Sequence, residues 1–407
     1  MRSLEEFNMW ARICVGVGCA GLAVMSAGCS GDSSPAGGVV THDGGSGGAS
    51  DATRGAAGDD SSGGAGEGWS DGAIGGEAGP CPLGSAPSTS SGTCEPLVRS
   101  SENWAHLGDV VAAARAKDAG LLYVDAEGGA FRMLFQLIDD AGRPLGEPVT
   151  LRTARESVRS IGIGLASDGT RYLACMSEMN DTQCLFLAPG SPPVQAYHVV
   201  GNAPSLAYGH GEWLVAYGVD GGQALQLLGA DGAEIGSPVL FPDSISGLTP
   251  KIPLAATPEG FVAVMGATEK IYRLDPELQL IGTPLDLGVG FWTYGSVAAT
   301  ESMIAVNLSV PYGSLLAWGG LSGSITKVAM SGGGKLGLPI DLLASGHGIS
   351  AAWDDSGTLS FEADVRSVLP NAEASSESDS LATVRIGAQT LVADVAGGFT
   401  LRVRRMP

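Results

Sequence analysis

The sequence has few basic residues. It contains 22 Lys and Arg residues against 43 Asp and Glu residues, which gives a formal net charge of −21 at pH 7. A surface of this charge repels the phosphate backbone of nucleic acids and the headgroups of anionic lipids. These repulsions exclude nucleic acid as a partner and exclude electrostatic adhesion to a membrane.

Motifs for metal and catalytic sites are also missing. No D-x-[DN]-x-[DN]-G loop for calcium occurs, and no C-x-x-C pair for zinc. His106 and His198 lack a fixed carboxylate or cysteine partner in the sequence, and His210 and His347 both sit in G-H-G stretches typical of turns. We therefore predict no metal, no cofactor and no catalytic residue.

Helical periodicity is absent from residue 110 onward. Apolar residues alternate with polar ones instead, and Gly, Pro, Asp or Ser interrupts the runs every eight to twelve residues. This pattern predicts an all-β protein.

One short apolar strand recurs seven times, at steps of 42 to 51 residues. The copies are LLYVD, YLACM, LVAYG, FVAVM, MIAVN, ISAAW and LVADV, centred on Tyr123, Ala174, Ala216, Ala263, Ala305, Ala351 and Ala393. Another strand precedes most copies, and two more follow. The units resemble the four-stranded blades of a β-propeller, in which stacking around a ring buries both apolar faces of each sheet.

The resemblance predicts seven blades. Six or eight remain alternatives, because the irregular stretch 367–380 obscures one boundary. The last unit stops before a fourth strand, whereas residues 96–100 form a spare β-like piece ahead of the first unit. We predict that this piece completes the seventh blade.

The N-terminal residues resemble the signal peptide of bacterial lipoproteins. An apolar run from Ile13 to Ala27 follows Arg12, is too short to prefer spanning a bilayer, and leads through Gly28 to Cys29. The resemblance implies cleavage after residue 28 and lipid on Cys29. A plain secretory cleavage and a helical anchor are the alternatives. Two glutamates near Met1 are unusual in such a signal, so Met9 is an alternative start.

A Gly-, Ser-, Ala- and Asp-rich segment follows the signal. It covers residues 29–80 and contains too little apolar surface to fold, so we predict a disordered tether with a mean reach of about 40 Å. The remaining divisions are a disulfide loop with the closing strand at 81–101 and the propeller at 102–407. The resemblance to lipoproteins implies an exported, lipid-anchored protein, and by the same resemblance Ser30 after Cys29 favours the outer membrane or cell surface.

Four cysteines remain once Cys29 and the signal are set aside. An even number in an oxidising compartment predicts two local disulfides, Cys81–Cys94 and Cys175–Cys184. Zinc is the competing interpretation, although neither pair has the spacing that zinc sites favour.

Clustered aromatic residues mark the leading candidate for a binding surface. Phe291, Trp292 and Tyr294 fall in the crossing from the fourth unit to the fifth, where they form either a ligand platform or packing between blades. A second candidate comprises Met176, Met179 and the loop to Asp181.

These features favour a monomeric, membrane-tethered scaffold that binds a protein, an envelope component or a glycan. A propeller enzyme acting on glycans, as lyase or hydrolase, is the alternative, and an envelope assembly factor is a third possibility. Carboxylates in perturbed environments at one channel mouth would favour the enzyme.

Overall fold

The structure is a computed structural model. It describes the backbone of residues 85–87 and 94–100, together with residues 109–127, 130–154, 161–242, 251–265, 270–288, 295–310, 313–321, 323–331, 340–346, 348–355, 358–368, 378–396 and 400–406. All belong to one compact unit, Ala73–Pro407. The predicted signal, Cys29, the tether and Cys81 lie outside the described residues. No helix in the described part of the chain is long and apolar enough to cross a membrane.

The described residues form seven antiparallel sheets, which confirms the predicted propeller. The first strands of the sheets are β3 (Val110–Ala114), β7 (Ile161–Ser167), β11 (Asn202–Gly209), β15 (Leu254–Thr257), β19 (Gly295–Ala299), β23 (Ile340–Ser345) and β26 (Ser378–Ile386). The second strands are β4 (Ala119–Glu127), β8 (Tyr172–Glu178), β12 (Glu212–Val219), β16 (Gly260–Met265), β20 (Met303–Val310), β24 (Gly348–Asp355) and β27 (Gln389–Ala396). We number the sheets as blades 1 to 7 in this order.

The outer strands complete each blade. The third strands are β5 (Ala130–Ile138), β9 (Asp181–Leu187), β13 (Gly222–Leu228), β17 (Lys270–Leu274), β21 (Gly313–Gly320), β25 (Thr358–Glu362) and β28 (Thr400–Met406). The fourth strands are β6 (Val149–Ala154), β10 (Val194–Val200), β14 (Glu234–Pro242), β18 (Leu285–Asp286) and β22 (Ile325–Ser331). Blade 6 has three strands in the described residues and a short 3₁₀ helix, η2 (Val365–Ser367).

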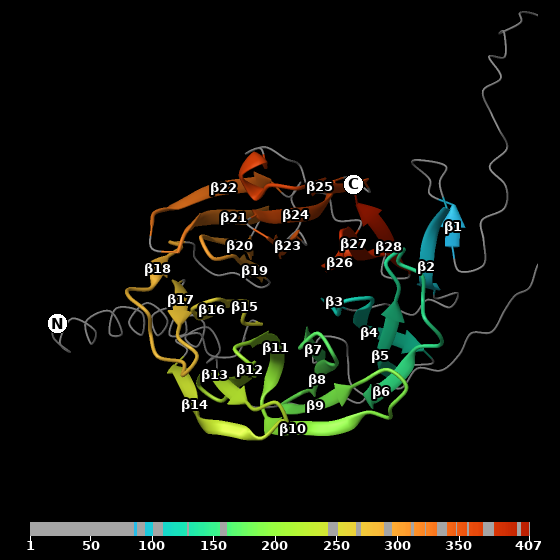
Figure 1. The fold of residues 1–407 in the computed structure, drawn as a ribbon, viewed down its shortest axis with the longest axis horizontal. Helices are drawn as coiled ribbons and strands as arrows, with labels where there is room; N and C mark the ends of the chain where they lie inside the picture. The colour runs from blue at the N-terminus through green and yellow to red at the C-terminus, as the bar shows by residue number, and fades with distance from the viewer. Residues whose placement is uncertain are drawn as a thin grey trace, which may run out of the picture. The chain divides into compact units, whose positions relative to one another are not determined.

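The first strands contact one another around a closed circle, from β3 through β26 and back to β3. Figure 1 shows them at the centre of the ring, with β6, β10, β14 and β22 on the outside. Every first strand begins at the same face of the ring, which we call the starting face. Because the sheets are antiparallel, the turns between second and third strands return to that face.

The apolar core is divided among the interfaces between blades. Seven clusters of buried side chains occur in the described residues, one between each pair of neighbouring blades. The central residues of the recurring strand are buried, with exposed fractions of 0 or 1% from Tyr123 to Ala393. Small alanines at six of these seven positions let adjacent sheets approach closely.

The ring closes through the N-terminal segment. β2 (Cys94–Ser100) pairs antiparallel with β28, and Leu97 lies opposite Arg402. β1 (Ser85–Pro87) then pairs with β2, so the seventh sheet has five strands. The predicted closing strand is confirmed, and it covers an edge of β28 that would otherwise be free.

An apolar residue followed by Gly-x-Pro recurs near the start of the fourth strand in blades 1, 3 and 4. Gly146, Gly236 and Gly282 have φ angles of 85°, 67° and 69°. This left-handed backbone favours glycine because it has no Cβ. Buried Gln136 and Gln226 donate to the carbonyls of Gly146 and Gly236, at 3.0 and 3.4 Å, which fixes the same turn in blades 1 and 3.

Candidate functional site

Two carboxylates occupy equivalent places on the innermost strands of the ring. Asp109 directly precedes Val110, which pairs with the central residue of the recurring strand in blade 1. Asp341 directly precedes Leu342, which pairs with the corresponding residue of blade 6. Both aspartates therefore lie at the starting-face end of an innermost strand.

A lysine from blade 4 carries the charge opposite to that of these carboxylates. Lys251 lies three residues before Leu254, which pairs with the central residue of its own blade. Lys251 therefore precedes β15 at the starting-face end of blade 4, as Asp109 precedes β3 in blade 1. Lys251 interacts electrostatically with both aspartates.

Burial shifts the pKa values of all three groups towards the neutral forms. It raises the pKa of Asp109 above its ordinary value, against the attraction of Lys251. It also raises the pKa of Asp341, against hydrogen bonds donated by the Thr383 amide at 2.6 Å and by the Thr383 hydroxyl. It lowers the pKa of Lys251, while Asp109 and Asp341 oppose the change. A lysine of this kind can act as a base or nucleophile, and a protonated aspartate can act as an acid.

A second charged cluster joins blades 1 and 2 at the starting face. Arg152 Nη2 on β6 lies 2.7 Å from Asp181 Oδ2 and 3.4 Å from Glu178 Oε2, across the blade boundary. His198 Nε2 on β10 lies 2.6 Å from Asp181 Oδ1. The expectation that His198 has no carboxylate partner is therefore wrong. Hydrogen bonds from His198 and Arg152 lower the pKa of Asp181.

The turn between β8 and β9 carries the second predicted surface. Met179 is 56% exposed and has a φ of 55°, which is unusual for a residue with a side chain. Met176 is fully buried between blades 1 and 2, so it does not contribute to that surface. Asp181 is engaged by the charged cluster, which leaves Met179 as the exposed apolar group.

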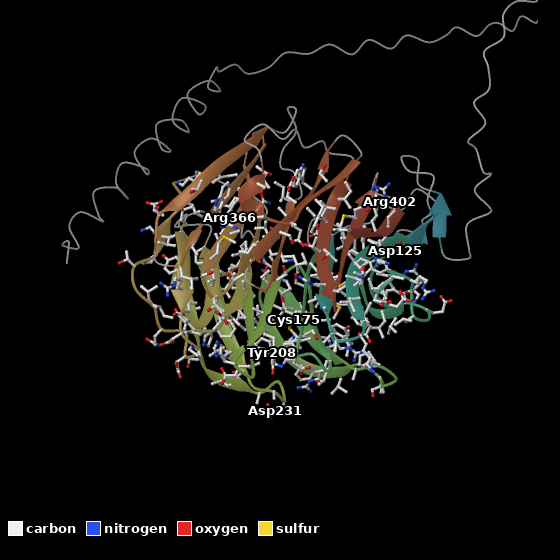
Figure 2. The ribbon with its side chains drawn as sticks, turned by 45° about the horizontal axis from the view of Figure 1, so that its top comes forward. Asp125, Cys175, Tyr208, Asp231, Arg366 and Arg402 are labelled. Atoms are coloured by element: carbon white, nitrogen blue, oxygen red, sulfur yellow. A yellow bond between two sulfur atoms is a disulfide. The ribbon has the colours of Figure 1, made fainter. Side chains whose placement is uncertain are left out.

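A disulfide joins Cys175 to Cys184 within this hairpin, as predicted. The two residues pair directly across β8 and β9, and Figure 2 labels Cys175 within blade 2. Cys94 begins β2, but its predicted partner Cys81 lies outside the described residues, so that disulfide stays a prediction.

Two other predictions concern surface positions. His210 lies in a turn with a φ of 57°, and its Nε2 is 2.8 Å from the Thr257 carbonyl oxygen of blade 4, so its assignment as a turn residue is confirmed. Phe291, Trp292 and Tyr294 lie outside the described residues, as do His106 and His347. Among the residues that the structure describes, no group of three His, Cys, Asp or Glu side chains is placed to hold a metal ion.

Exposed large apolar side chains gather on the outside of blades 1 to 4. In the described residues they are Leu145, Val149, Met179, Val194, Val200, Ile235, Leu240 and Leu280. All except Met179 belong to a fourth strand or to the turn that leads into one. We call the outer strands β6, β10 and β14 with these side chains the apolar rim.

The blades differ in how their outer edges are protected. β18 is only two residues long, β22 contains Lys327, and β28 is covered by β2. β14 contains Pro238 and Pro242. β6 and β10 contain neither proline nor lysine, and each instead has a shift in its pairing register, at Leu151 and at Ala196, of the kind that a β-bulge produces.

A groove of about 220 Å³ adjoins β6 on the apolar rim. Leu145, Val149 and Leu151 line it on the side of blade 1, and Leu187 and Pro193 line it on the side of blade 2. Small-molecule pockets are usually about 300–1,000 Å³. The groove is therefore better suited to individual side chains than to a whole small ligand.

The sequence matches no protein-family model, and no curated protein matches it. Among solved structures, the chain is similar to virginiamycin B lyase from Staphylococcus aureus, with 9% identity over 75% of this chain and 97% of that chain and a TM-score of 0.47. It is also similar to hydrazine synthase from Kuenenia stuttgartiensis, with 11% identity over 74% of this chain and 96% of that chain and a TM-score of 0.51. At such low identity the similarity shows the fold alone, and the activity of neither neighbour is assigned to this chain.

Proposed function

We propose that this protein is a membrane-tethered cell-envelope scaffold that binds another protein through its apolar rim. The observation that carries the proposal is the concentration of exposed apolar side chains on β6, β10 and β14, of which β6 and β10 lack proline and lysine. Such edges are ready templates for pairing with another chain. The closed ring supplies a rigid support for them.

The tether is part of the proposal. A lipid on Cys29 would anchor the mature chain, and residues 30–80 would hold the propeller away from the bilayer. Mass spectrometry of the protein from bacterial membranes tests this. We expect an acylated N-terminal Cys29 in the wild type and a soluble, unacylated product from Cys29→Ser. A mature chain that begins elsewhere would contradict the anchor.

Photocrosslinking in cells tests the binding role. A photoreactive amino acid replaces Val194 on the rim in one strain and exposed Arg366 of blade 6 in a matched control strain. We expect one partner to crosslink at position 194 and not at 366, and to bind the purified propeller. Equal crosslinking at the two positions would contradict a rim-specific role.

The ionisable groups on the innermost strands support a second candidate function, a glycan lyase or hydrolase. Lys251, Asp109 and Asp341 place acid–base groups with shifted pKa values at the starting-face ends of first strands. Incubation with envelope polysaccharides tests this function. Product formation by the wild type that is lost in both Lys251→Met and Asp341→Asn, with folding retained, would support it.

A further inference from the structure

We infer that β6 and the groove beside it receive an extended segment of a partner protein, with alternating apolar side chains and a Lys or Arg near Glu147. The inference rests on the proposed binding function and assigns its contact site. It is argued from the free strand edge, the groove and the charge at the end of the groove.

The free edge provides the backbone contacts. β6 has six residues and, among the described strands, pairs only with β5. Its other edge faces outward on the ring (Figure 1). An extended chain can add to such an edge through main-chain hydrogen bonds, which supply affinity without depending on side-chain identity.

The groove provides side-chain selection. Val149 and Leu151 both line the groove. The pairing register of β6 shifts at Leu151, so the groove lining and not strict alternation places the two side chains together. An added strand would place every second side chain on the side of the groove. Leu187 and Pro193 of blade 2 form the far wall, which makes this side apolar. The site therefore selects a segment with apolar residues at alternate positions.

Glu147 provides the charge preference. It is the charged residue of the groove lining, it is exposed, and it forms no hydrogen bond or ion pair with the residues that the structure describes. At the corresponding place in their Gly-x-Pro sequences, blades 3 and 4 have the uncharged residues Ser237 and Thr283. A cationic side chain of the partner would pair with Glu147, and the protein's net charge of −21 also favours a basic partner segment.

A hydrogen-bonded ion pair joins blade 1 to blade 2 near the end of β6. Arg152 of β6 is bonded to Asp181 of blade 2, so the two walls are joined at the starting face. A binding groove that is already formed requires less ordering when a partner binds.

Selection from a peptide library tests the inference. The probe is a displayed library of ten-residue peptides in which apolar residues alternate with random ones, panned against the purified propeller. We expect the selected peptides to carry Lys or Arg near one end, and N-methylation of their edge-facing amides to weaken binding at least tenfold. The absence of any selectable peptide would overturn the inference.

Variants of exposed residues locate the site. Val149→Lys is expected to weaken binding of the selected peptides at least tenfold, whereas Thr326→Lys, at an exposed position of β22 outside the apolar rim, is the matched control and leaves it unchanged. Glu147→Lys is expected to reduce binding of the Lys-containing peptide and to restore binding when Glu replaces that Lys. Unchanged binding by Val149→Lys would overturn the assignment.

The outcomes separate this inference from the proposed function. If a partner crosslinks at Val194 but no peptide binds at β6, the scaffold proposal stands and the assignment to β6 is wrong. If neither assay detects binding at the rim, both are wrong.

Discussion

Cys175 and Cys184 lie directly opposite each other on β8 and β9, with their Cα atoms 4.0 Å apart, and a disulfide joins them. Both residues are fully buried between blades 2 and 3. The bond therefore fixes the hairpin that carries Met179 and the charged cluster at its tip.

Loss of this disulfide should destabilise the propeller. We expect the double substitution Cys175→Ala and Cys184→Ala to lower the free energy of unfolding by about 2–3 kcal/mol, from the entropy that closing so short a loop removes from the unfolded chain. Urea unfolding, monitored by fluorescence, measures the change. Dithiothreitol should lower the free energy of unfolding of the wild type by a similar amount, and a wild type unaffected by reduction would contradict the prediction. If dithiothreitol also lowers the free energy of unfolding of the double variant, that loss reports the predicted Cys81–Cys94 bond.

Removal of the closing strand should destabilise the ring. Deletion of residues 95–101 removes most of β2, leaves the edge of β28 uncovered and opens the closure. We expect a marked fall in melting temperature, measured by differential scanning calorimetry. Deletion of residues 44–50 removes the same number of residues from the predicted tether and should leave the melt unchanged. Equal effects of the two deletions would show that β2 does not close the ring.

Gly232 and Gly146 allow backbone strain to be separated from steric overlap. Their φ angles are 86° and 85°, so alanine should cost about 1 kcal/mol at either position. A Cβ on Gly232 would lie 2.8 Å from the carbonyl oxygen of Ala196, whereas a Cβ on Gly146 would meet nothing within 4 Å. We expect Gly232→Ala to be the more destabilising in urea unfolding. Equal losses would mean that β10 moves to admit the methyl group.

Asp109, Asp341 and Lys251 should make the free energy of unfolding depend on pH. Asp109 and Asp341 have raised pKa values, so the folded protein retains protons that the unfolded chain releases above about pH 4. Stability from these groups therefore falls as pH rises through their folded pKa values. Lys251→Met removes the positive charge that lowers both pKa values, so the fall should extend to higher pH.

The lysine itself has the opposite pH dependence. Because burial lowers the pKa of Lys251, wild-type stability should rise as pH increases from the folded pKa towards about 10.4, and Lys251→Met should lack this rise. Urea unfolding across the pH range measures both effects. Lys117→Met, at an exposed turn position, is the control. Parallel pH profiles for wild type and Lys251→Met would contradict the electrostatic coupling.

Asp181 should contribute stability that acid removes. Hydrogen bonds from His198 and Arg152 lower its pKa, so its contribution is present above about pH 3.9 and is lost as pH falls through the folded pKa. We expect Asp181→Asn to be slightly less stable at pH 7, with the difference vanishing in acid, because the aspartate is half exposed. Asp220→Asn in the corresponding turn of blade 3 should show no such difference. A constant deficit at all pH values would exclude the ionic contribution.

Local patterns predicted the strands and their partners well, but one turn shows where they are insufficient. Leu278 holds the position that Gly142 and Gly232 hold in the related turns, and its φ is 62° against 79° and 86°. Propensity alone places glycine there. Leu278 adopts the left-handed backbone because its side chain is buried, with 6% exposure, in the cluster between blades 3 and 4.

The site residues divide in the same way. The bond between Cys175 and Cys184 was predictable because a hairpin brings nearby positions together. The partnership of His198 with Asp181 was missed, although both belong to adjacent strands, because it depends on the pairing register of β9 and β10. The lack of proline and lysine in β6 and β10 is visible in the sequence, but the sheet order is needed to show that these strands are outermost.

Alternation, spacing and short-range pairing are enough to predict the seven repeated blades, the closing strand and the disulfide between neighbouring strands. The interaction of Lys251 with Asp109 and Asp341, and the apolar rim on the fourth strands of blades 1 to 3, follow from the three-dimensional arrangement of the blades. Closing the ring brings distant first strands to one channel and sends fourth strands to the outside, and no local pattern encodes which residues then meet.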